Sequence, residues 1–151
     1  MSRSNASRRR ASLVLVGVAA ALSLSACASP GSSSPSDTGT ASVEIDTATP
    51  AGEKAQWIVD LLNADEDTTV AEWEPELHES FVAEVSSDEL VDLLNTDIRP
   101  AAPYTVTGYE DSGTQSVTTL ESDVVDPMNM SVTLDDAGQI VGLWFGPTSA
   151  G

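Results

Sequence analysis

The apolar residues in the middle of the chain follow a helical period. Residues 54–63 place Trp57, Ile58, Leu61 and Leu62 at helical spacing, and Asn63 is suited to end a helix. Side chains three and four positions apart share one side of a helix. This stretch therefore predicts an amphipathic helix that buries its apolar side against another element.

A second start signal follows at Thr69 and Glu72, which have the spacing of a capping box. Pro75 interrupts this stretch, because proline is tolerated in the first turn of a helix but not in its interior. We therefore expect one helical turn over residues 70–74 and a separate helix over residues 75–82 that Pro75 opens.

Another cap lies at Ser86, three residues before Glu89, and it precedes the apolar residues of the segment 90–94. Pro100 and Pro103 come shortly after this segment. We expect the two prolines to end the helical half of the chain.

After Pro103 the period of the pattern changes from about 3.6 to 2, which is typical of strands. Four segments have this character, and turn residues separate them at 111–113 and 135–138: they are residues 104–109, 117–121, 128–134 and 139–145. Helices followed by strands predict an α+β domain, with the N-terminal helices packed on one face of an antiparallel sheet of about four strands.

The first 27 residues have the organisation of an export signal. Basic residues at the start precede an apolar run from Leu13 to Leu24, which is too short to span a bilayer at about 1.5 Å per helical residue. The run ends in Leu24-Ser25-Ala26-Cys27, the pattern that lipoprotein signal peptidase accepts. We expect residues 1–26 to be removed and Cys27 to be lipidated, with either the general or the twin-arginine route used for export.

Composition divides the rest of the chain. Residues 27–52 are rich in Ser, Thr, Pro, Gly and Ala, so we expect a disordered tether between the lipidated Cys27 and a domain over residues 53–147, followed by a short tail over residues 148–151. The lipid would hold the protein at the extracytoplasmic face of the cell membrane, because two acyl chains give lasting attachment.

The charge of the mature chain excludes one class of partner. After Cys27 only Lys54 and Arg99 are basic, whereas all 24 acidic residues lie there. Binding to nucleic acid needs a basic surface, so nucleic acid is not an expected partner. The membrane, reached through the lipid, and an unidentified protein or small ligand remain.

Three segments resemble the Cpe/LpqF family: residues 57–63 (WIVDLLN), 76–85 (ELHESFVAEV) and 132–145 (VTLDDAGQIVGLWF). The resemblance is to the N-terminal domain that precedes a β-lactamase-like serine hydrolase. It implies a cone of the NTF2-like or cystatin-like type, as in SnoaL and steroid isomerase, in which helices cover a curved sheet. The Ser-x-x-Lys nucleophile of the hydrolase is missing, because position 51, three residues before Lys54, is alanine. We therefore expect a helper domain without acyl-enzyme chemistry.

The implied fold also suggests residues that could line a ligand pocket. Asp60 could act as a base and Tyr104 or Tyr109 as a hydrogen-bond donor, as in isomerase-like sites. His78 is the only histidine, and Trp144 could form an apolar wall. The simpler interpretations are a solvated Asp60, a His78 paired with a neighbouring carboxylate, and tryptophans packed in the core, Trp57 and Trp144 above all.

Residues 63–68 place oxygen-bearing side chains at alternate positions, and Glu74 lies where a calcium loop has its closing glutamate. Thr68 occupies the position where such a loop needs glycine for its sharp turn. The sequence therefore favours a polar loop between helices, and we predict neither a metal nor a cofactor.

These observations support a non-catalytic, membrane-tethered binding or accessory module, which could serve a separately encoded β-lactamase-like hydrolase. The alternative is a small-molecule-binding or isomerase-like enzyme that uses the mouth of the cone. A deep pocket that holds Asp60 or a tyrosine beside apolar walls would favour the enzyme. A mouth filled by tryptophan and leucine side chains would favour the binding module.

Overall fold

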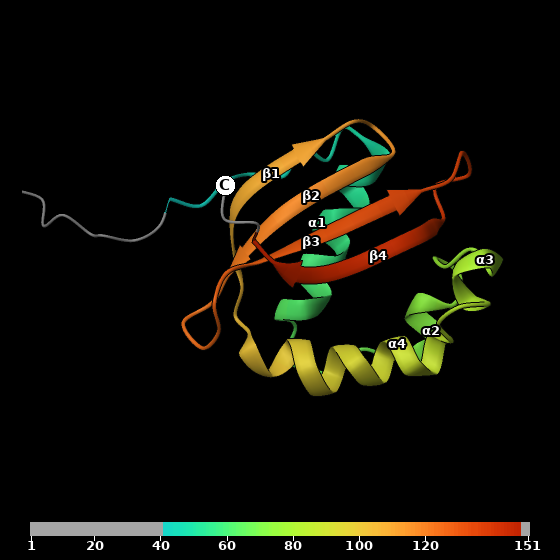
Figure 1. Cartoon of the computed structure of the whole chain (residues 1–151), viewed down its shortest axis with the longest axis horizontal. Coiled ribbons are helices and arrows are strands. Elements are labelled where there is room, and N and C mark those ends of the chain that lie inside the picture. The colour runs from blue at the N-terminus through green and yellow to red at the C-terminus, as the bar shows by residue number, and fades with distance from the viewer. Residues whose placement is uncertain (1–40, 149–151) are drawn as a thin grey trace, which may run out of the picture. The chain divides into compact units, whose positions relative to one another are not determined.

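The computed structural model describes residues 41–148, in which short helices precede a sheet (Figure 1). The helical elements are α1 (Pro50–Asn63), α2 (Val70–Trp73), α3 (Glu79–Val82), α4 (Ser87–Leu93), the π-helical turn η1 (Leu94–Ile98) and the 3-10 turn η2 (Arg99–Ala101). The strands are β1 (Thr105–Asp111), β2 (Gln115–Glu121), β3 (Met128–Leu134) and β4 (Ile140–Pro147). The predicted α+β fold is confirmed. The predicted signal peptide, Cys27 and the first part of the tether lie outside the described residues.

The strands form an open antiparallel sheet in the order β1-β2-β3-β4, so each strand pairs with its neighbour in sequence. Gly113 and Gly138 lie in the β1–β2 and β3–β4 connections with φ of 93° and 82°, values that glycine adopts without the strain other residues meet. On β3 the alternation is clear, because Met130, Val132 and Leu134 are buried while the residues between them are partly exposed.

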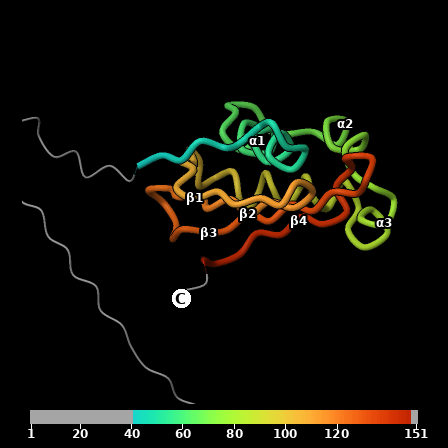
Figure 2. The backbone as a smooth tube through the Cα atoms, turned by 90° about the horizontal axis from the view of Figure 1, so that it is seen from above, coloured from blue at the N-terminus to red at the C-terminus, as the bar shows by residue number. Residues whose placement is uncertain are grey.

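Helix α1 covers one face of the sheet, and Figure 2 shows it lying across that face along its length. Side chains from α1, α2 and the sheet meet in this layer with at most 1% of their surface exposed: Ala55, Ile58, Leu62, Trp73, Leu120, Met130 and Val132. Trp57 packs at the edge of this core, where its ring meets the Trp73 ring edge-on at 4.8 Å between centroids. No helix among residues 41–148 has the length and apolar character needed to cross a bilayer.

Both predicted capping boxes are present. At α4 the Ser86 Oγ accepts from the Glu89 N–H (3.3 Å). The Glu89 carboxylate accepts from the Ser86 hydroxyl (2.8 Å) and from the Ser86 N–H (3.1 Å), and these bonds hold the pKa of Glu89 below its ordinary value. At α2 the Glu72 carboxylate accepts from the backbone N–H of Thr69 (2.7 Å) and from its hydroxyl (2.9 Å), and these bonds lower the pKa of Glu72.

The predicted helix over residues 75–82 is wrong for its first half, since only residues 79–82 are helical (α3). The Ile140 N–H donates to the Glu76 carbonyl (2.8 Å) and the His78 N–H donates to the Ile140 carbonyl (3.0 Å), so Leu77 forms an isolated parallel bridge to β4. Glu76 therefore ends a turn, Leu77 forms the bridge, His78 is extended, and α3 begins only at Glu79. A contact with a strand more than 60 residues away decides this backbone, and Pro75 gives no sign of it.

The ordered chain begins earlier than predicted, because the predicted boundary after residue 52 lies inside α1. Thr49 caps this helix by accepting from the Gly52 N–H (3.0 Å), and Pro50 occupies the first turn. Further upstream, Ile45 is buried and the Val43 N–H donates to the Val106 carbonyl of β1 (2.8 Å). The pair Thr49-Pro50 is a helix-start signal that the composition of the segment obscured.

Candidate functional site

The residues proposed for an isomerase-like site each have a different partner. Asp60 is exposed on α1 and accepts from the Gln56 amide (2.8 Å). Tyr104 is buried, which raises the pKa of its hydroxyl, and that hydroxyl donates to the Ile98 carbonyl (2.6 Å). The Tyr109 hydroxyl donates to Asp111 (2.8 Å). These contacts do not join Asp60, Tyr104 and Tyr109 in one constellation.

The space in which a cone-shaped fold would hold a ligand is filled. Ile58, Leu62, Leu120 and Met130 occupy the layer between α1 and the sheet, and Trp73 closes it, each with at most 1% of its surface exposed. A ligand of ordinary size needs a cavity of about 300 Å³ or more. The packed layer leaves no such room behind α1.

His78 caps α3 and also lines an open pocket of about 550 Å³, together with Glu74 and Glu79. Its Nδ1 accepts from the Ser80 N–H (3.1 Å) and lies 2.8 Å from the Ser80 Oγ, while its Nε2 lies 3.8 Å from the Asp135 carboxylate. A serine beside an imidazole is also the core of acyl-transfer sites, but these need free N–H groups for the developing oxyanion. The N–H of Ser80 is bound to the imidazole and the N–H of Phe81 to the His78 carbonyl, so the arrangement is that of a helix cap.

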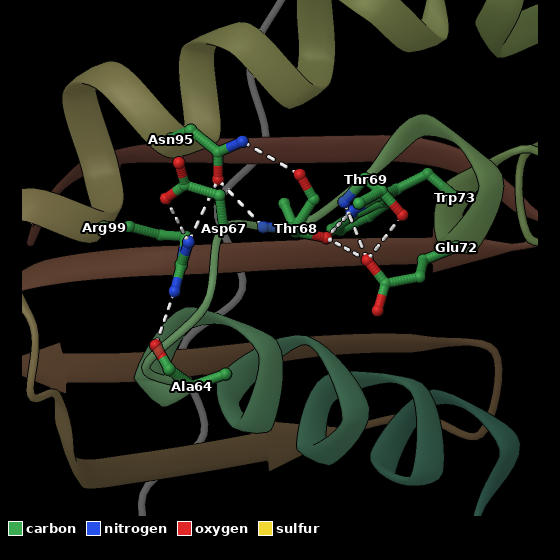
Figure 3. Close-up of polar contacts among 8 residues, drawn as sticks. All are labelled: Ala64, Asp67, Thr68, Thr69, Glu72, Trp73, Asn95 and Arg99. Atoms are coloured by element: carbon green, nitrogen blue, oxygen red, sulfur yellow. Dashed lines mark hydrogen bonds and ion pairs between the residues drawn. The ribbon is translucent and has the colours of Figure 1, made fainter.

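A polar network fastens the loop between α1 and α2 to Asn95 of η1 and Arg99 of η2 (Figure 3). Arg99, 9% exposed, donates from Nη1 to Asp67 (2.8 Å) and Asn95 (3.2 Å) and from Nη2 to the Ala64 carbonyl. The Asn95 amide in turn binds the N–H and the carbonyl of Thr68 (3.1 and 2.9 Å). Each backbone group that Arg99 and Asn95 bind lies in the loop, so the network fixes the loop's course.

The oxygen-bearing side chains of residues 63–68, which resemble part of a calcium loop, make hydrogen bonds within the protein. Asp67 pairs with Arg99, and the Asn63 amide binds the N–H and carbonyl of Tyr104 (2.7 and 3.0 Å). Within residues 41–148, no group of three or more His, Cys, Asp or Glu side chains is arranged to hold a metal ion. The oxygens of this run thus join the end of α1 and the loop after it to η2 and to the residue before β1.

An apolar groove of about 410 Å³ lies between the helices and β4. Its helical wall is formed by Phe81 of α3, Val85 of the following loop, Leu90 and Leu93 of α4, and Ile98 of η1. Phe81 and Leu90 are buried, whereas Leu93 keeps 44% of its surface exposed. The groove is thus anchored in the core at its base and open at its rim.

The strand wall consists of Leu143, Trp144 and Phe145 of β4. Leu143 and Phe145 point toward the helices and pack on the core, so strand alternation turns Trp144 to the opposite side, where 54% of its surface is exposed. The expected burial of Trp144 in the core is therefore wrong. Its ring lies against Gly146, where a Cβ would approach the indole to about 2.0 Å.

The groove carries negative charge at its rim. Glu84 and Glu89 line it. The two basic residues that follow Cys27 are engaged elsewhere, since Lys54 pairs with Glu76 and Arg99 with Asp67. An apolar floor with an acidic rim suits a ligand that is both apolar and basic.

Comparison with known protein families matches residues 45–140 to the family described as ORF 12 gene product N-terminal. The chain belongs to this family. The match to the ORF 12 N-terminal family begins at the buried Ile45 and ends at Ile140, the first residue of β4. It includes the helical wall of the groove, whereas the strand wall lies beyond it. A search of curated proteins gave no significant match.

Among the residues of this groove, the sequence pattern offered Trp144 as a site candidate, and it did not indicate the groove itself. The groove arises because α4 and η1 run beside β4, and no local pattern specifies that packing. The available signal was the sequence Leu143-Trp144-Phe145, in which three bulky apolar residues in a strand cannot all face one core.

Proposed function

We propose that this protein is a lipid-anchored, extracytoplasmic lipoprotein that acts as a non-catalytic binding module, with the groove between α4 and β4 as its binding surface. One observation carries the proposal. The groove leaves Val85 (38%) and Leu93 (44%) exposed in a lining that is mostly apolar. Clustered apolar exposure of this kind is typical of interaction sites.

The anchor is supported by the sequence Leu24-Ser25-Ala26-Cys27 after an apolar run, and by the polar segment that precedes α1. A tethered module needs no catalytic residues of its own. The filled layer behind α1 and the separate partners of Asp60, Tyr104 and Tyr109 favour this proposal over an isomerase-like enzyme.

We also propose that the chain is related to the Cpe/LpqF family within the wider group that the family match defines. The family description refers to the N-terminal part of a gene product, which fits a domain that works beside another. On the resemblance to the Cpe/LpqF family, we propose that the partner is a separately encoded β-lactamase-like hydrolase.

Fatty-acid labelling tests the anchor. Cells that express the chain are grown with an alkyne-tagged palmitate, and the wild type is expected to carry the label and to fractionate with membranes. The Cys27→Ser variant should lose both properties. Label on the variant, or an unlabelled wild type, would refute the anchor.

Site-specific cross-linking in intact cells tests the groove. A photoreactive amino acid in place of Leu93 is expected to give a discrete protein adduct, which mass spectrometry then identifies. Val124 is the matched control position, because it is an exposed valine (68%) that does not line the groove. Identical adducts at the two positions, or none at either, would count against a protein-binding groove.

A further inference from the structure

We infer that the groove binds an extended polypeptide segment of alternating apolar and basic residues, which pairs with the free edge of β4 as an added strand. This inference rests on the proposed protein-binding function and names the chemistry of the partner.

The outer edge of β4 has room for another strand. β4 is the last strand of the sheet and pairs with β3 on one side. On the other side, the backbone bonds that β4 makes outside the sheet within residues 41–148 are those of Ile140 to Glu76 and His78. The residues further along, Leu143 to Phe145, border the groove. A strand edge with unpaired N–H and C=O groups is a template for strand addition.

The chain itself shows that this edge accepts an extended segment. Leu77 forms a parallel bridge to Ile140, with hydrogen bonds of 2.8 and 3.0 Å on either side of it. After His78 the chain turns away into α3, so the pairing stops where the groove begins. A partner strand would pair with the outer edge of β4 beyond Ile140, where the chain's own residues 76–78 no longer cover it.

A helix is a poorer occupant, because its backbone groups are bonded internally and would leave those of the β4 edge unpaired. In an added strand, successive side chains point to opposite sides. Every second residue would therefore meet the apolar lining formed by Leu90, Leu93, Leu143 and Phe145.

The acidic residues at the rim of the groove indicate that the partner segment is basic. Glu84 and Glu89 border the groove, and Lys54 and Arg99 are bound to acidic partners elsewhere. The exposed indole of Trp144, on the other side of β4, adds an aromatic face for a lysine or arginine that points away from the apolar lining. A second copy of this acidic chain would bring like charges together at the rim, so a basic segment of another protein fits better.

Three synthetic eight-residue peptides test the inference against the full-length Cys27→Ser protein. The first alternates leucine and lysine, the second has the same composition in helical order (Leu-Lys-Lys-Leu-Leu-Lys-Lys-Leu), and the third alternates leucine and glutamate. Affinity is measured by titration, and amide hydrogen exchange reports on residues 142–146. The alternating leucine–lysine peptide should bind most tightly and slow exchange in β4.

Charge variants provide the second arm of the test. Glu84→Gln with Glu89→Gln should weaken binding of the leucine–lysine peptide by about fivefold or more. Gln at position 89 can still accept from the Ser86 N–H, so the cap of α4 is kept. The control is Asp136→Asn in the exposed β3–β4 turn, which should leave the affinity unchanged.

Tighter binding of the helical-order peptide, equal binding of the acidic peptide, or binding without slower exchange in residues 142–146 would overturn the inference. So would failure of all three peptides to bind. If the cross-link at position 93 still forms in that case, the groove binds a protein in another manner, and only the strand-addition inference fails.

Discussion

Replacing Arg99 by methionine should lower the free energy of unfolding more than replacing Asp67 by alanine, although each change removes the same ion pair. The Arg99 side chain is 7% exposed and the Asp67 side chain 82%. An ion pair with one partner in water contributes at most about 1 kcal/mol, so Asp67→Ala should cost about 0 to 1 kcal/mol.

Arg99→Met removes more than the ion pair. The guanidinium also donates to the Ala64 carbonyl and to Asn95, and hydrogen bonds from a charged donor contribute about 1.5–3 kcal/mol each. Arg99 Nε is buried without a partner among the described residues, which costs about 1–3 kcal/mol that methionine would recover. At the middle of these ranges, the two hydrogen bonds (about 4.5 kcal/mol) less the recovered cost (about 2 kcal/mol) leave a net loss of about 2–3 kcal/mol.

Thermal unfolding followed by circular dichroism measures both changes. For a domain of about 100 residues, 1 kcal/mol corresponds to about 4 °C in Tm. Arg99→Met should thus lower Tm by about 8–12 °C, and Asp67→Ala by less than about 4 °C. Equal losses would mean that the ion pair itself holds the loop, and an unchanged Arg99→Met variant would refute the role of the network.

Three further predictions concern stability. Gly52→Ala should lower the free energy of unfolding in urea by about 1–3 kcal/mol, although alanine has the better helix propensity. The alanine Cβ would lie 1.8 Å from the Asp46 carbonyl oxygen, a clash with the backbone that no side-chain rotation relieves. An unchanged free energy of unfolding would refute the close approach. Trp73→Ala should cost about 3–5 kcal/mol, since the ring is fully buried, and a loss below 1 kcal/mol would contradict that packing. Hydrogen bonds from Thr69 lower the pKa of Glu72, so the contribution of this carboxylate to stability is full above the unfolded-state pKa and is lost as pH falls through the folded-state pKa. The stability difference between wild type and Glu72→Ala should therefore shrink below about pH 4, and a constant difference would refute this role of Glu72.

The elements whose signals are local could be predicted from the sequence. The change of period near Pro103 placed all four strands, and the capping residues Thr69 and Ser86 marked α2 and α4. Both kinds of signal act within a few residues, through side-chain alternation and through bonds to the nearest free N–H groups. Contacts with distant parts of the chain therefore did not change these elements.

The features that depend on distant contacts could not be predicted. Leu77 is extended because Ile140 pairs with it, and Trp144 is exposed because Leu143 and Phe145 take the side that faces the helices. The groove follows from the packing of α4 beside β4, which sequence spacing does not encode. His78 was expected beside a carboxylate and does lie 3.8 Å from Asp135, but its role as the cap of α3 depended on where that helix begins.

The two borders of the sheet differ in a way that limits self-assembly. The chain's own residues ahead of α1 lie against β1, where Val43 donates to Val106 and Thr49 to Asp111. In the part of the chain described, the outer edge of β4 is bonded only at its first residue, Ile140. Growth of a fibre requires each molecule to receive a strand on one border and offer one on the other. A molecule blocked on one border can join at most one neighbour in this way, so head-to-tail polymerisation stops at a pair.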